Sequence, residues 1–495
     1  MLTAGQTQAL DFLSTFLDSD ATAASLQGGA GVGKTYLTSE FIKQLLAEGR
    51  TVVVAAPTHK ACAVLRAKLD AAGIKWAFKP KAEVPAGVAV VDTTAALLGI
   101  RPVDPDVDAP EGEQDERTFK TVGAGSLQKL FGVSFSSLTP VLLVDEASMV
   151  PSNQFWDLHA YLKAGGAKLV CIGDSGQLPP VKAVAIDFEA DFDGGAFTLT
   201  EVVRQAKGSS IIGLAWVIRL DTAEGAPETR KALSSAGLLD EDVRVAGEQC
   251  INQFLAQVTV PAVKETERTV FIAYRNSTVD YVQEHAAQKV YQHSASEFRT
   301  GELVIASTAA YAETFGTYVC KFTGKVKPSK FPRKEQVVAV ADQLKVVSLS
   351  DAADPVYGRP VKLERIDLPA GASGRFFTSY FLSREDQKNP EHPFAQKTKA
   401  LREEALKLAR EVKALRAEGK HQAADDVDKK RGQAWGALYD HQQKVVGFTH
   451  PFAITSHKSQ GSTYHTVFAA TAELLQYNRK ALYVAVTRPS KFLVL

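Results

Sequence analysis

The sequence predicts an α/β chain with two parallel-sheet domains. Apolar runs typical of buried strands alternate with amphipathic helices over residues 1–98 and 126–200, which is the pattern of a doubly wound sheet. The alternation begins again over residues 201–300 and resumes over 446–495. A different pattern separates these last two stretches, so we expect a second sheet domain that is split by an insertion at 301–445.

Length and composition agree with several domains and limit the class of protein. At 495 residues the chain is too long for a single core, and 45% hydrophobic with 23% charged residues is ordinary globular composition. No apolar run approaches the ~20 residues that span a bilayer, and the N-terminus lacks the features of a signal peptide. The cysteines form no C-x-x-C pair, which argues against a zinc site. We therefore expect a cytoplasmic protein without membrane contact, whose net charge of +1 leaves any nucleic-acid surface to a local basic patch.

The chain opens on a helical pattern, LTAGQTQALDFLSTFL, which is expected to pack on the first sheet. Gln6 lies at its start. An amide can hydrogen-bond both edges of an adenine ring, although a lone glutamine near an N-terminus is more often solvated.

The stretch GGAGVGKT, at residues 28–35, is a complete G-x-x-x-x-G-K-T phosphate-binding loop between a short strand and an amphipathic helix. Its glycines let successive backbone N–H groups face one anion at a helix N-terminus. Lys34 is expected to reach the β- and γ-phosphates, and Thr35 to offer its hydroxyl to Mg²⁺. A flexible glycine-rich turn is the weaker alternative. The predicted nucleotide contacts are Gly28, Gly29, Ala30, Gly31, Val32, Gly33, Lys34 and Thr35.

A later strand of the first domain, LTPVLLV, ends in Asp145 and Glu146. A carboxylate at this end of a buried strand is placed to hold Mg²⁺, and its neighbour to orient or deprotonate an attacking water. A simple strand-end cap is the weaker alternative. The next strand, AKLVCIG, is followed by Gln177, which could sense the γ-phosphate. These residues predict hydrolysis, with ATP and Mg²⁺ as the cofactors.

Arg204 follows an apolar stretch after the first domain and is a candidate arginine finger. The five fixed donors of a guanidinium suit the charge that spreads over a phosphoryl group during transfer. An isolated arginine is more often structural, so this assignment depends on the rest of the pattern.

Between residues 99 and 125 the alternation breaks, and prolines and acidic residues exclude a core role. We expect a hairpin that leaves the first sheet, with Phe119 as its only aromatic residue. A solvated surface loop is an equal alternative.

The insertion at 301–445 has two parts. Short strand patterns predict a small β-barrel in the first part, and long helical patterns predict a helical hairpin at 395–440 in the second. Within the first part, six basic residues lie near Phe322 and Phe331 without an acid among them. Such a segment suits a nucleic-acid strand, and a solvated loop is an equal alternative. The six residues are Lys321, Lys325, Lys327, Lys330, Arg333 and Lys334.

Taken in order, the motifs resemble those of a known family. They are LTAGQ, GGAGVGKT, APTHKA, LLVDEAS, IGDSGQLPP, LTEVVRQ, ITSHKSQGST and YVAVTRPS. This set resembles the superfamily 1 helicases of the RecD-like branch, superfamily 1B, and within it the small phage helicases of the Dda type. The resemblance covers the sheet domains, about two thirds of the chain, and implies that both are RecA-like.

The resemblance also implies nucleotide contacts outside the phosphate loop. Gln6 would read adenine, and Gln177 would couple the γ-phosphate to motion. Arg204 and Arg488 would act as fingers across the cleft between the two sheet domains. The contacts implied in the second domain's fifth motif are Gln460 and Gly461.

For nucleic acid, the resemblance implies a strand-separating hairpin and an SH3-like barrel in the insertion. The hairpin would be residues 99–125, and Phe119 would separate the strands. One position departs from the family pattern, because Ala95 stands where a DNA-contacting histidine is usual. The residues implied to line the single-stranded DNA path are Pro57, Thr58, His59, His457 and Lys458.

The activity implied by the resemblance is that of an ATP-dependent DNA helicase, which moves 5′→3′ on single-stranded DNA and unwinds duplex through DNA-stimulated hydrolysis. Its partners would be single-stranded and forked duplex DNA, and possible protein partners are a single-stranded-DNA-binding protein or replication and recombination proteins. The enzyme would act as a monomer in a bacterial or phage-infected cell. The alternative is a non-translocating phosphate-loop ATPase that loads or remodels a nucleoprotein partner. The two predicted fingers favour the motor, because a motor needs them from a second domain of the same chain.

Overall fold

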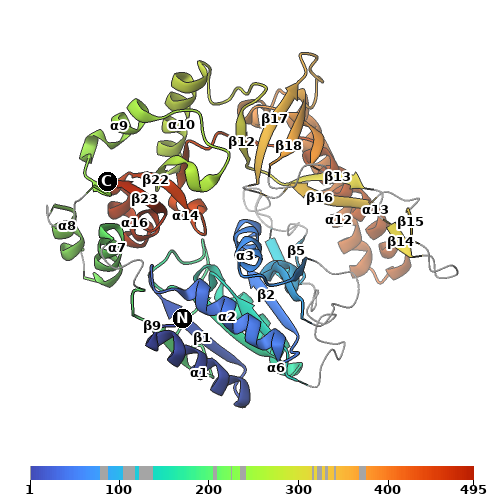
Figure 1. Ribbon diagram of the computed structural model, residues 1–495. Helices are drawn as coiled ribbons and strands as arrows, with labels where there is room; N and C mark the ends of the chain where they lie inside the picture. Colours follow the sequence, from blue (N-terminus) through green and yellow to red (C-terminus); the bar gives the residue numbers. More distant parts are fainter. Residues whose placement is uncertain are drawn as a thin grey trace. The chain divides into compact units, whose positions relative to one another are not determined.

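A computed structural model describes residues 2–78, 87–103, 118–121, 138–203, 209–223, 226–234, 241–314, 317–319, 326–328, 333–338, 340, 342–366 and 375–495 (Figure 1). These residues form two compact units. The first unit comprises residues up to Val103, Thr118–Val282 and Phe452–Leu495, and the second comprises Gln283–Pro451. Arg204, one of the two predicted arginine fingers, lies outside the described residues.

The first unit contains a seven-stranded sheet whose neighbouring strands are all parallel, with the order β3-β4-β2-β7-β8-β1-β9. Five of its strands are buried along their whole length, and their sequences are mostly apolar without the alternation of a half-exposed strand. The strands are β1 Ala23–Gly28, β2 Val52–Ala56, β3 Trp76–Phe78, β4 Ala89–Thr93, β7 Val141–Val144, β8 Lys168–Gly173 and β9 Ala196–Leu199.

Helices cover both faces of this sheet. Helices α1 (Ala4–Asp18), α2 (Lys34–Ala47) and α3 (His59–Ala71) contribute to one hydrophobic core, and α6 (Ser152–Ala164) contributes to the core on the opposite face. Short helices α4 (Thr94–Leu97) and η1 (Ala147–Met149) follow strands β4 and β7. The layered arrangement places the carboxyl ends of β1, β7 and β8 along one edge, where ligands of open α/β sheets bind.

A two-stranded antiparallel ladder follows α4. Its strands are β5 (Ile100–Val103) and β6 (Thr118–Thr121), and the pairing sets Pro102 opposite Phe119. The described residues therefore form the base of the hairpin that was predicted at 99–125. The side chain of Phe119 lies outside the described part of the structure.

The first unit also contains a second parallel sheet, with the order β10-β23-β22-β11-β21. Its strands come from two distant parts of the chain, as expected for a split domain. They are β10 Val243–Arg244, β11 Thr269–Ala273, β21 Ala453–Thr455, β22 Tyr464–Ala469 and β23 Pro489–Val494. The accompanying helices are α7 Ser210–Leu220, α8 Pro227–Ser234, η4 Gly247–Gln249, α9 Cys250–Gln257, η5 Glu265–Glu267, α14 Ser456–Ser459, α15 Thr471–Tyr477 and α16 Arg479–Val486. Helix α10 (Asn276–Tyr291) runs from this domain into the second unit.

The second unit contains an antiparallel sheet of order β19-β18-β17-β12-β20. The two edge strands of this sheet, β19 and β20, are connected by an additional bridge. It pairs Tyr380 in β19 with Val445, just before β20, and closes the sheet into a small barrel. The strands are β12 Leu303–Ala306, β17 Gln343–Leu349, β18 Arg359–Arg365, β19 Phe376–Phe381 and β20 Phe448–Thr449. Two further ladders pair β13 Ala310–Thr314 with β16 Arg333–Val338, and β14 Thr317–Val319 with β15 Val326–Pro328.

A helical hairpin follows β19 and the short helix α11 (Arg384–Lys388). It consists of α12 (Pro393–Ala417) and α13 (His421–Gln442), which meet around a small apolar core. The turn between them contains Gly419 at φ 73°, a left-handed conformation that glycine adopts without strain. The predicted fold class, two RecA-like sheets with a hairpin insertion in the first and a barrel plus helical hairpin in the second, is confirmed. The boundaries drawn between the domains stay predictions.

No described helix is both long enough and apolar enough to span a bilayer.

Candidate nucleotide-binding site

The phosphate loop joins the end of β1 to the start of α2. Gly31 and Gly33 both have left-handed backbones, at φ 78° and 77°, which other residues adopt only with strain. Space is also limited, since a Cβ added to Gly28 would lie 2.7 Å from a methyl group of Val32. A Cβ added to Gly33 would overlap the amide of Gln6. The glycine pattern is therefore required by both backbone conformation and packing.

Lys34, the first residue of α2, lies over its own loop. Its ammonium group donates hydrogen bonds to the carbonyl oxygens of Gly28 and Gly29, the second at 3.0 Å. An ammonium group has three donors, so one remains for a phosphate oxygen.

Three carboxylates of the first sheet act electrostatically on Lys34. Burial lowers the pKa of Lys34, and the charges of Asp174, Glu146 and Asp145 oppose that shift. The acidic residues that follow β7 and β8 are thus close enough to act on the lysine of the phosphate loop.

Asp145 is fixed at the end of β7. Its backbone N–H donates to the carbonyl of Ala55, and one carboxylate oxygen accepts a 3.0 Å hydrogen bond from the backbone of Glu146. The other carboxylate oxygen lies 3.7 Å from the ammonium nitrogen of Lys68. Mg²⁺ prefers a few carboxylate or hydroxyl oxygens together with water and phosphate, and Asp145 with the exposed Thr35 hydroxyl fits that donor set.

Glu146 has an unusual backbone. Its φ of 53° and ψ of 38° are left-handed, a conformation that costs a non-glycine residue about 1–2 kcal/mol. Burial and repulsion from Asp145 raise the pKa of Glu146, and the positive charges of Arg488, Lys68 and Lys34 partly offset this rise. A strained, part-buried carboxylate beside a phosphate loop has the features of a catalytic group.

Gln6 lies against the phosphate loop, but its amide already has partners. Its carbonyl oxygen accepts the backbone N–H of Thr3 at 3.0 Å, which completes a capping box at the start of α1. Its amide nitrogen donates to the carbonyl of Val32 at 3.3 Å. Gln6 therefore ties the first helix to the loop, and its contact with adenine stays a prediction.

Asp174, at the end of β8, connects the first sheet to the second sheet's domain. Its carboxylate is buried at 1% exposure. One oxygen accepts from Arg219 Nε at 2.9 Å and from the backbone of Gly176 at 3.0 Å, and the other accepts the hydroxyl of Tyr483 at 2.6 Å. Arg219 lies on α7 and Tyr483 on α16, so two residues of the second domain satisfy a buried charge of the first.

The same two helices also form hydrogen bonds with the phosphate loop itself. The backbone N–H of Ala30 donates to the Tyr483 hydroxyl at 3.0 Å, and the Ala30 carbonyl accepts from Trp216 Nε1 at 3.1 Å. Trp216 lies so close that a Cβ added to Gly29 would be 3.0 Å from its ring. Both polar groups of the Ala30 residue are thus held by the second domain.

Arg488, the other predicted finger, follows α16 and is buried at 8% exposure. Its guanidinium donates to the carbonyls of Val484 and Ser462 at 3.1 and 3.2 Å, and to the hydroxyl of Thr487 at 2.9 Å. It is held by its own domain, while its charge still acts on Glu146. Its role as a finger stays a prediction.

Gln177 follows β8 and lines a cavity of about 350 Å³ together with Ser148 and Lys480. Within the described part of the chain, the side-chain oxygens of Gln177 and Ser148 are buried without a hydrogen-bond partner. Lys480 donates to the carbonyl of Ser175 at 2.8 Å and so reaches the same loop from the second domain. A buried carbonyl oxygen without a partner is available to a hydrogen-bond donor. The sensing role of Gln177 toward the γ-phosphate stays a prediction.

Gln460 and Gly461 lie after α14 in the second domain. Gln460 is buried at 6% exposure and donates to the carbonyl of Leu178, across the two sheets, at 3.4 Å. Gly461 has a left-handed φ of 75°. The hydrogen bond places Gln460 next to the loop that carries Gln177, and a direct nucleotide contact of either residue stays a prediction.

The residues predicted to line the DNA path lie on two helix starts. Pro57, Thr58 and His59 begin α3, where the hydroxyl of exposed Thr58 caps the helix through Ala61 at 3.1 Å. On the second sheet, His457 and exposed Lys458 lie on α14.

Sequence reasoning missed an aromatic group beside His457. Its ring lies 5.6 Å from Tyr274, which stacks on half-exposed Tyr477 with ring centroids 5.0 Å apart. The guanidinium of Arg275 lies 5.6 Å from the Tyr477 ring. Aromatic and basic side chains gather at this end of β11, which suits a nucleic-acid strand.

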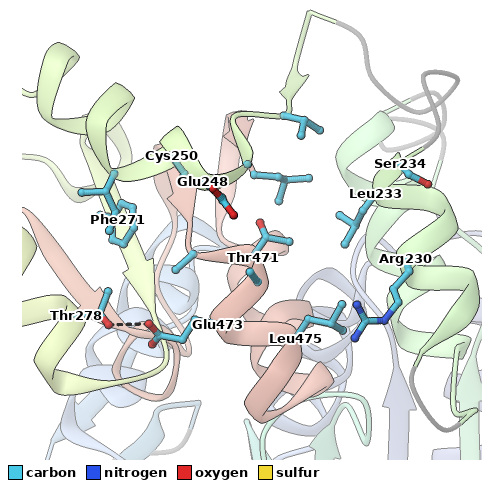
Figure 2. Close-up of a pocket in the computed structure, with 16 residues that line it drawn as sticks. Arg230, Leu233, Ser234, Glu248, Cys250, Phe271, Thr278, Thr471, Glu473 and Leu475 are labelled. Atoms are coloured by element: carbon cyan, nitrogen blue, oxygen red, sulfur yellow. Dashed lines mark hydrogen bonds between the residues drawn. The ribbon is translucent and has the colours of Figure 1, made fainter.

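A second cavity, of about 540 Å³, lies in the second sheet's domain (Figure 2). Its walls include Leu233 on α8, Phe271 on β11 and Leu475 on α15, and at one end Glu473 accepts a 2.6 Å hydrogen bond from Thr278. None of its lining residues belongs to the phosphate loop, so this cavity is separate from the nucleotide site.

Sequence reasoning also missed the contacts that cross between the sheets: Trp216, Arg219, Tyr483 and the acceptor Asp174. Two of them stood inside quoted motifs, Asp174 in IGDSGQLPP and Tyr483 in YVAVTRPS. The sequence therefore contained Asp174 and Tyr483 within recognised motifs, but it did not indicate which residues they contact.

Two protein families match the chain. An AAA domain matches residues 1–241, which contain the first sheet, and a UvrD-like helicase C-terminal domain matches residues 450–495, which contain three strands of the second. An uncharacterized protein of Acanthamoeba polyphaga mimivirus is 27% identical over 165 residues. That match covers 32% of this chain and 29% of the viral protein, so the chain matches less than a third of its relative's length.

The comparison with solved structures gives helicases. The crystal structure of Pif1 helicase from Candida albicans is 15% identical with a TM-score of 0.46, and the comparison covers 100% of this chain and 94% of that one. The crystal structure of Bacteroides Pif1 bound to ssDNA is 16% identical with a TM-score of 0.44, covering 100% and 92%. The AAA domain match and the UvrD-like helicase C-terminal match fall in this order on two parallel sheets that meet at a phosphate loop, and this order agrees with the resemblance of the motifs to the superfamily 1B helicases.

Proposed function

We propose that this protein is an ATP-dependent DNA helicase that moves 5′→3′ along single-stranded DNA and unwinds duplex DNA through DNA-stimulated hydrolysis. The observation that carries the proposal is the position of the phosphate loop between two sheets. The first sheet supplies Lys34 and its carboxylates, and the second domain holds Ala30 through Trp216 and Tyr483. A nucleotide in this loop contacts both domains, so its binding and hydrolysis change the distance between them.

The hydrolytic roles follow from the groups at the loop. Glu146 would orient or deprotonate the attacking water, and Lys34 would bind the β- and γ-phosphates. Mg²⁺, held by Thr35 and Asp145, would neutralise charge that develops on the phosphates. Transition-state charge would also be stabilised by Arg204 and Arg488, and Gln177 would report the γ-phosphate to the loop after β8.

A single strand would lie against the starts of α3 and α14. Pro57, Thr58 and His59 would contact it from the first sheet, and His457 and Lys458 from the second. The stack of Tyr274 on Tyr477 supports this assignment, because exposed aromatic faces beside basic groups bind unpaired bases and backbone phosphates. The hairpin at 99–125 would separate the strands, with Phe119 at the junction. Its two-stranded base, which leaves the first sheet after α4, supports that role.

The direction of movement rests on the resemblance of the motifs to superfamily 1B. A monomer would be the active form, acting on single-stranded and forked duplex DNA. Protein partners would be a single-stranded-DNA-binding protein or replication and recombination proteins.

Two measurements test the proposal. ATP hydrolysis by the full chain, with and without oligo-dT, should rise strongly with DNA. Equal rates would instead favour a non-translocating ATPase that loads or remodels a partner. Forked duplexes with a single tail then test direction: a 5′ tail should support unwinding, and unwinding that needs a 3′ tail would reverse the assignment. Lys34→Ala is the control, since it removes hydrolysis under both hypotheses.

A further inference from the structure

One backbone donor of the phosphate loop is already occupied by a side chain from the other domain. The N–H of Ala30 donates to the hydroxyl oxygen of Tyr483 at 3.0 Å. Tyr483 is buried at 1% exposure on α16, while Ala30 belongs to the loop after β1. We propose that Tyr483 is a positioning residue that occupies the phosphate loop in the absence of nucleotide and must release Ala30 when the phosphates of ATP bind. This inference rests on the proposed nucleotide-dependent function.

The direction of each hydrogen bond follows from counting protons. The N–H of Ala30 can only donate, so the Tyr483 oxygen accepts it. A phenol has a single proton, and here that proton points to the carboxylate of Asp174 at 2.6 Å. Burial raises the pKa of Tyr483, and the neighbouring charge of Asp174 raises it further, so the phenol keeps its proton. A directed chain therefore runs from the phosphate loop through Tyr483 to a buried acid of the first sheet.

The acid at the end of this chain depends on the second domain. Asp174 also accepts from Arg219 at 2.9 Å and is 1% exposed. A buried carboxylate that loses its partners is costly, because its charge is then neither solvated nor paired. Arg219 therefore keeps Asp174 paired when Tyr483 moves, and the two second-domain residues have different tasks.

Phosphate oxygens and the Tyr483 oxygen compete for the same donor. Backbone N–H groups of a phosphate loop point at the bound phosphates, and Ala30 lies between Gly28 and Gly33 in that loop. The other side of Ala30 is held as well, since its carbonyl accepts from Trp216 at 3.1 Å. The loop cannot simply turn away from Tyr483 without breaking this second hydrogen bond.

Removing the hydroxyl should therefore tighten nucleotide binding. In Tyr483→Phe the ring remains, but the N–H of Ala30 has no partner until phosphate supplies one. The empty protein is destabilised by the loss of one hydrogen bond, whereas the nucleotide-bound protein regains it. We expect the Kd for nucleotide to fall about 3–10-fold, which is the usual size of one such bond.

The test is a calorimetric titration of the full chain, without DNA, with ADP and with a non-hydrolysable ATP analogue in the presence of Mg²⁺. Wild type is compared with Tyr483→Phe and with Tyr161→Phe, the same change on α6 at a side chain that is 37% exposed. Tyr483→Phe should bind about 3–10-fold more tightly, and Tyr161→Phe should equal wild type. Affinity of Tyr483→Phe that is unchanged or weaker overturns the proposal.

A kinetic measurement distinguishes positioning from general support of the fold. With saturating oligo-dT, Tyr483→Phe should lower the KM for ATP by about 3–10-fold, in parallel with the Kd. A merely structural role would raise KM, and that result also overturns the proposal. If Tyr483→Phe does not fold, Tyr483→Leu replaces it, because it lacks the hydroxyl and carries the same expectation. Wild type that binds no nucleotide would contradict the proposed function itself.

Discussion

The ammonium nitrogen of Lys60 lies 2.9 Å from a carboxylate oxygen of Glu265. Lys60 is in the first turn of α3, and Glu265 begins η5 ahead of β11, so this ion pair joins the two sheets. Burial alone would lower the pKa of Lys60, but the neighbouring Tyr464 and Glu265 outweigh it and raise the pKa. The pair lies beside Thr58 and His59, on the predicted DNA path, whereas the Tyr483 link lies at the phosphate loop.

Breaking this ion pair should strengthen DNA binding. In Glu265→Gln the ammonium of Lys60 loses its carboxylate and becomes available to a DNA phosphate. We expect tighter binding of oligo-dT, and a plot of log K against log salt that steepens by about 0.7 for the one added contact. Fluorescence anisotropy at several salt concentrations measures both quantities.

The matched control is Glu267→Gln, two residues along the same short helix. Its partner Lys264 is 75% exposed in the side chain, so the same loss of charge releases no buried cation. Equal salt slopes for Glu265→Gln and Glu267→Gln would show that Lys60 gains no contact with DNA when Glu265 loses its charge.

Glu146 should be essential for turnover and dispensable for nucleotide binding. Glu146→Gln keeps the shape of the side chain but cannot accept a proton from water. A lost general base lowers kcat by about 10²–10⁴-fold, and we expect the Kd for an ATP analogue to stay within a few-fold. Steady-state hydrolysis together with a binding titration checks this, and a kcat within about 10-fold of wild type would assign the base to another residue.

Phe119→Ala should separate unwinding from hydrolysis. The hairpin that carries Phe119 leaves the first sheet and contains none of the groups at the phosphate loop. DNA-stimulated hydrolysis should therefore stay near the wild-type rate while unwinding of a forked duplex falls. Thr121→Ala, on the same strand, is the control. Parallel loss of both activities in Phe119→Ala would place this residue in the DNA grip and not in strand separation.

Glu302 should set the acid stability of the second unit. Its buried carboxylate lies 2.6 Å from His293 Nε2 and 3.1 Å from His450 Nε2. Burial alone would raise the pKa of Glu302, but the hydrogen bonds from His450 and His293 outweigh it and the pKa is lowered. A carboxyl group with a lowered pKa stabilises the fold above its unfolded pKa, and that stabilisation is lost as pH falls through the folded value.

Glu302→Gln should accordingly lose about 1.5–3 kcal/mol of unfolding free energy at neutral pH, the usual worth of hydrogen bonds to a charged group. The difference from wild type should shrink as the pH is lowered below about 4.3, the ordinary pKa of a glutamate. Denaturant unfolding at several pH values measures it. A difference that does not depend on pH would show that packing, and not the carboxylate charge, is responsible.

The parts of the site that could be predicted from the sequence are those built by neighbouring residues. The phosphate loop and the pair Asp145-Glu146 are local, because each follows directly from a strand end in a parallel sheet. The split second sheet was also predictable, because the alternation of strand and helix patterns stops at the insertion and resumes after it. Arg488 was identified from a motif, but the motif does not predict which carbonyl groups accept its hydrogen bonds.

The parts that could not be predicted depend on the approach of distant segments. Ala30 and Tyr483 are more than four hundred and fifty positions apart in sequence, and no periodicity relates them. Asp174 was visible as an acid at a strand end, yet its arginine partner lies on a helix of the other domain. Gln6 shows the opposite case, because Thr3 and Gln6 form a T-x-x-Q capping box that local rules could have found.

The left-handed backbone of Glu146 has a consequence for engineering. Glycine at this position would relieve about 1–2 kcal/mol of strain and remove a carboxylate that Asp145 repels, offset by the about 0.5–1 kcal/mol that glycine costs through the unfolded chain. Selection for heat resistance alone would therefore favour a variant that lacks the Glu146 carboxylate and no longer hydrolyses ATP. Stability and turnover oppose each other at this one residue, so any search for hardier variants needs hydrolysis as a second criterion.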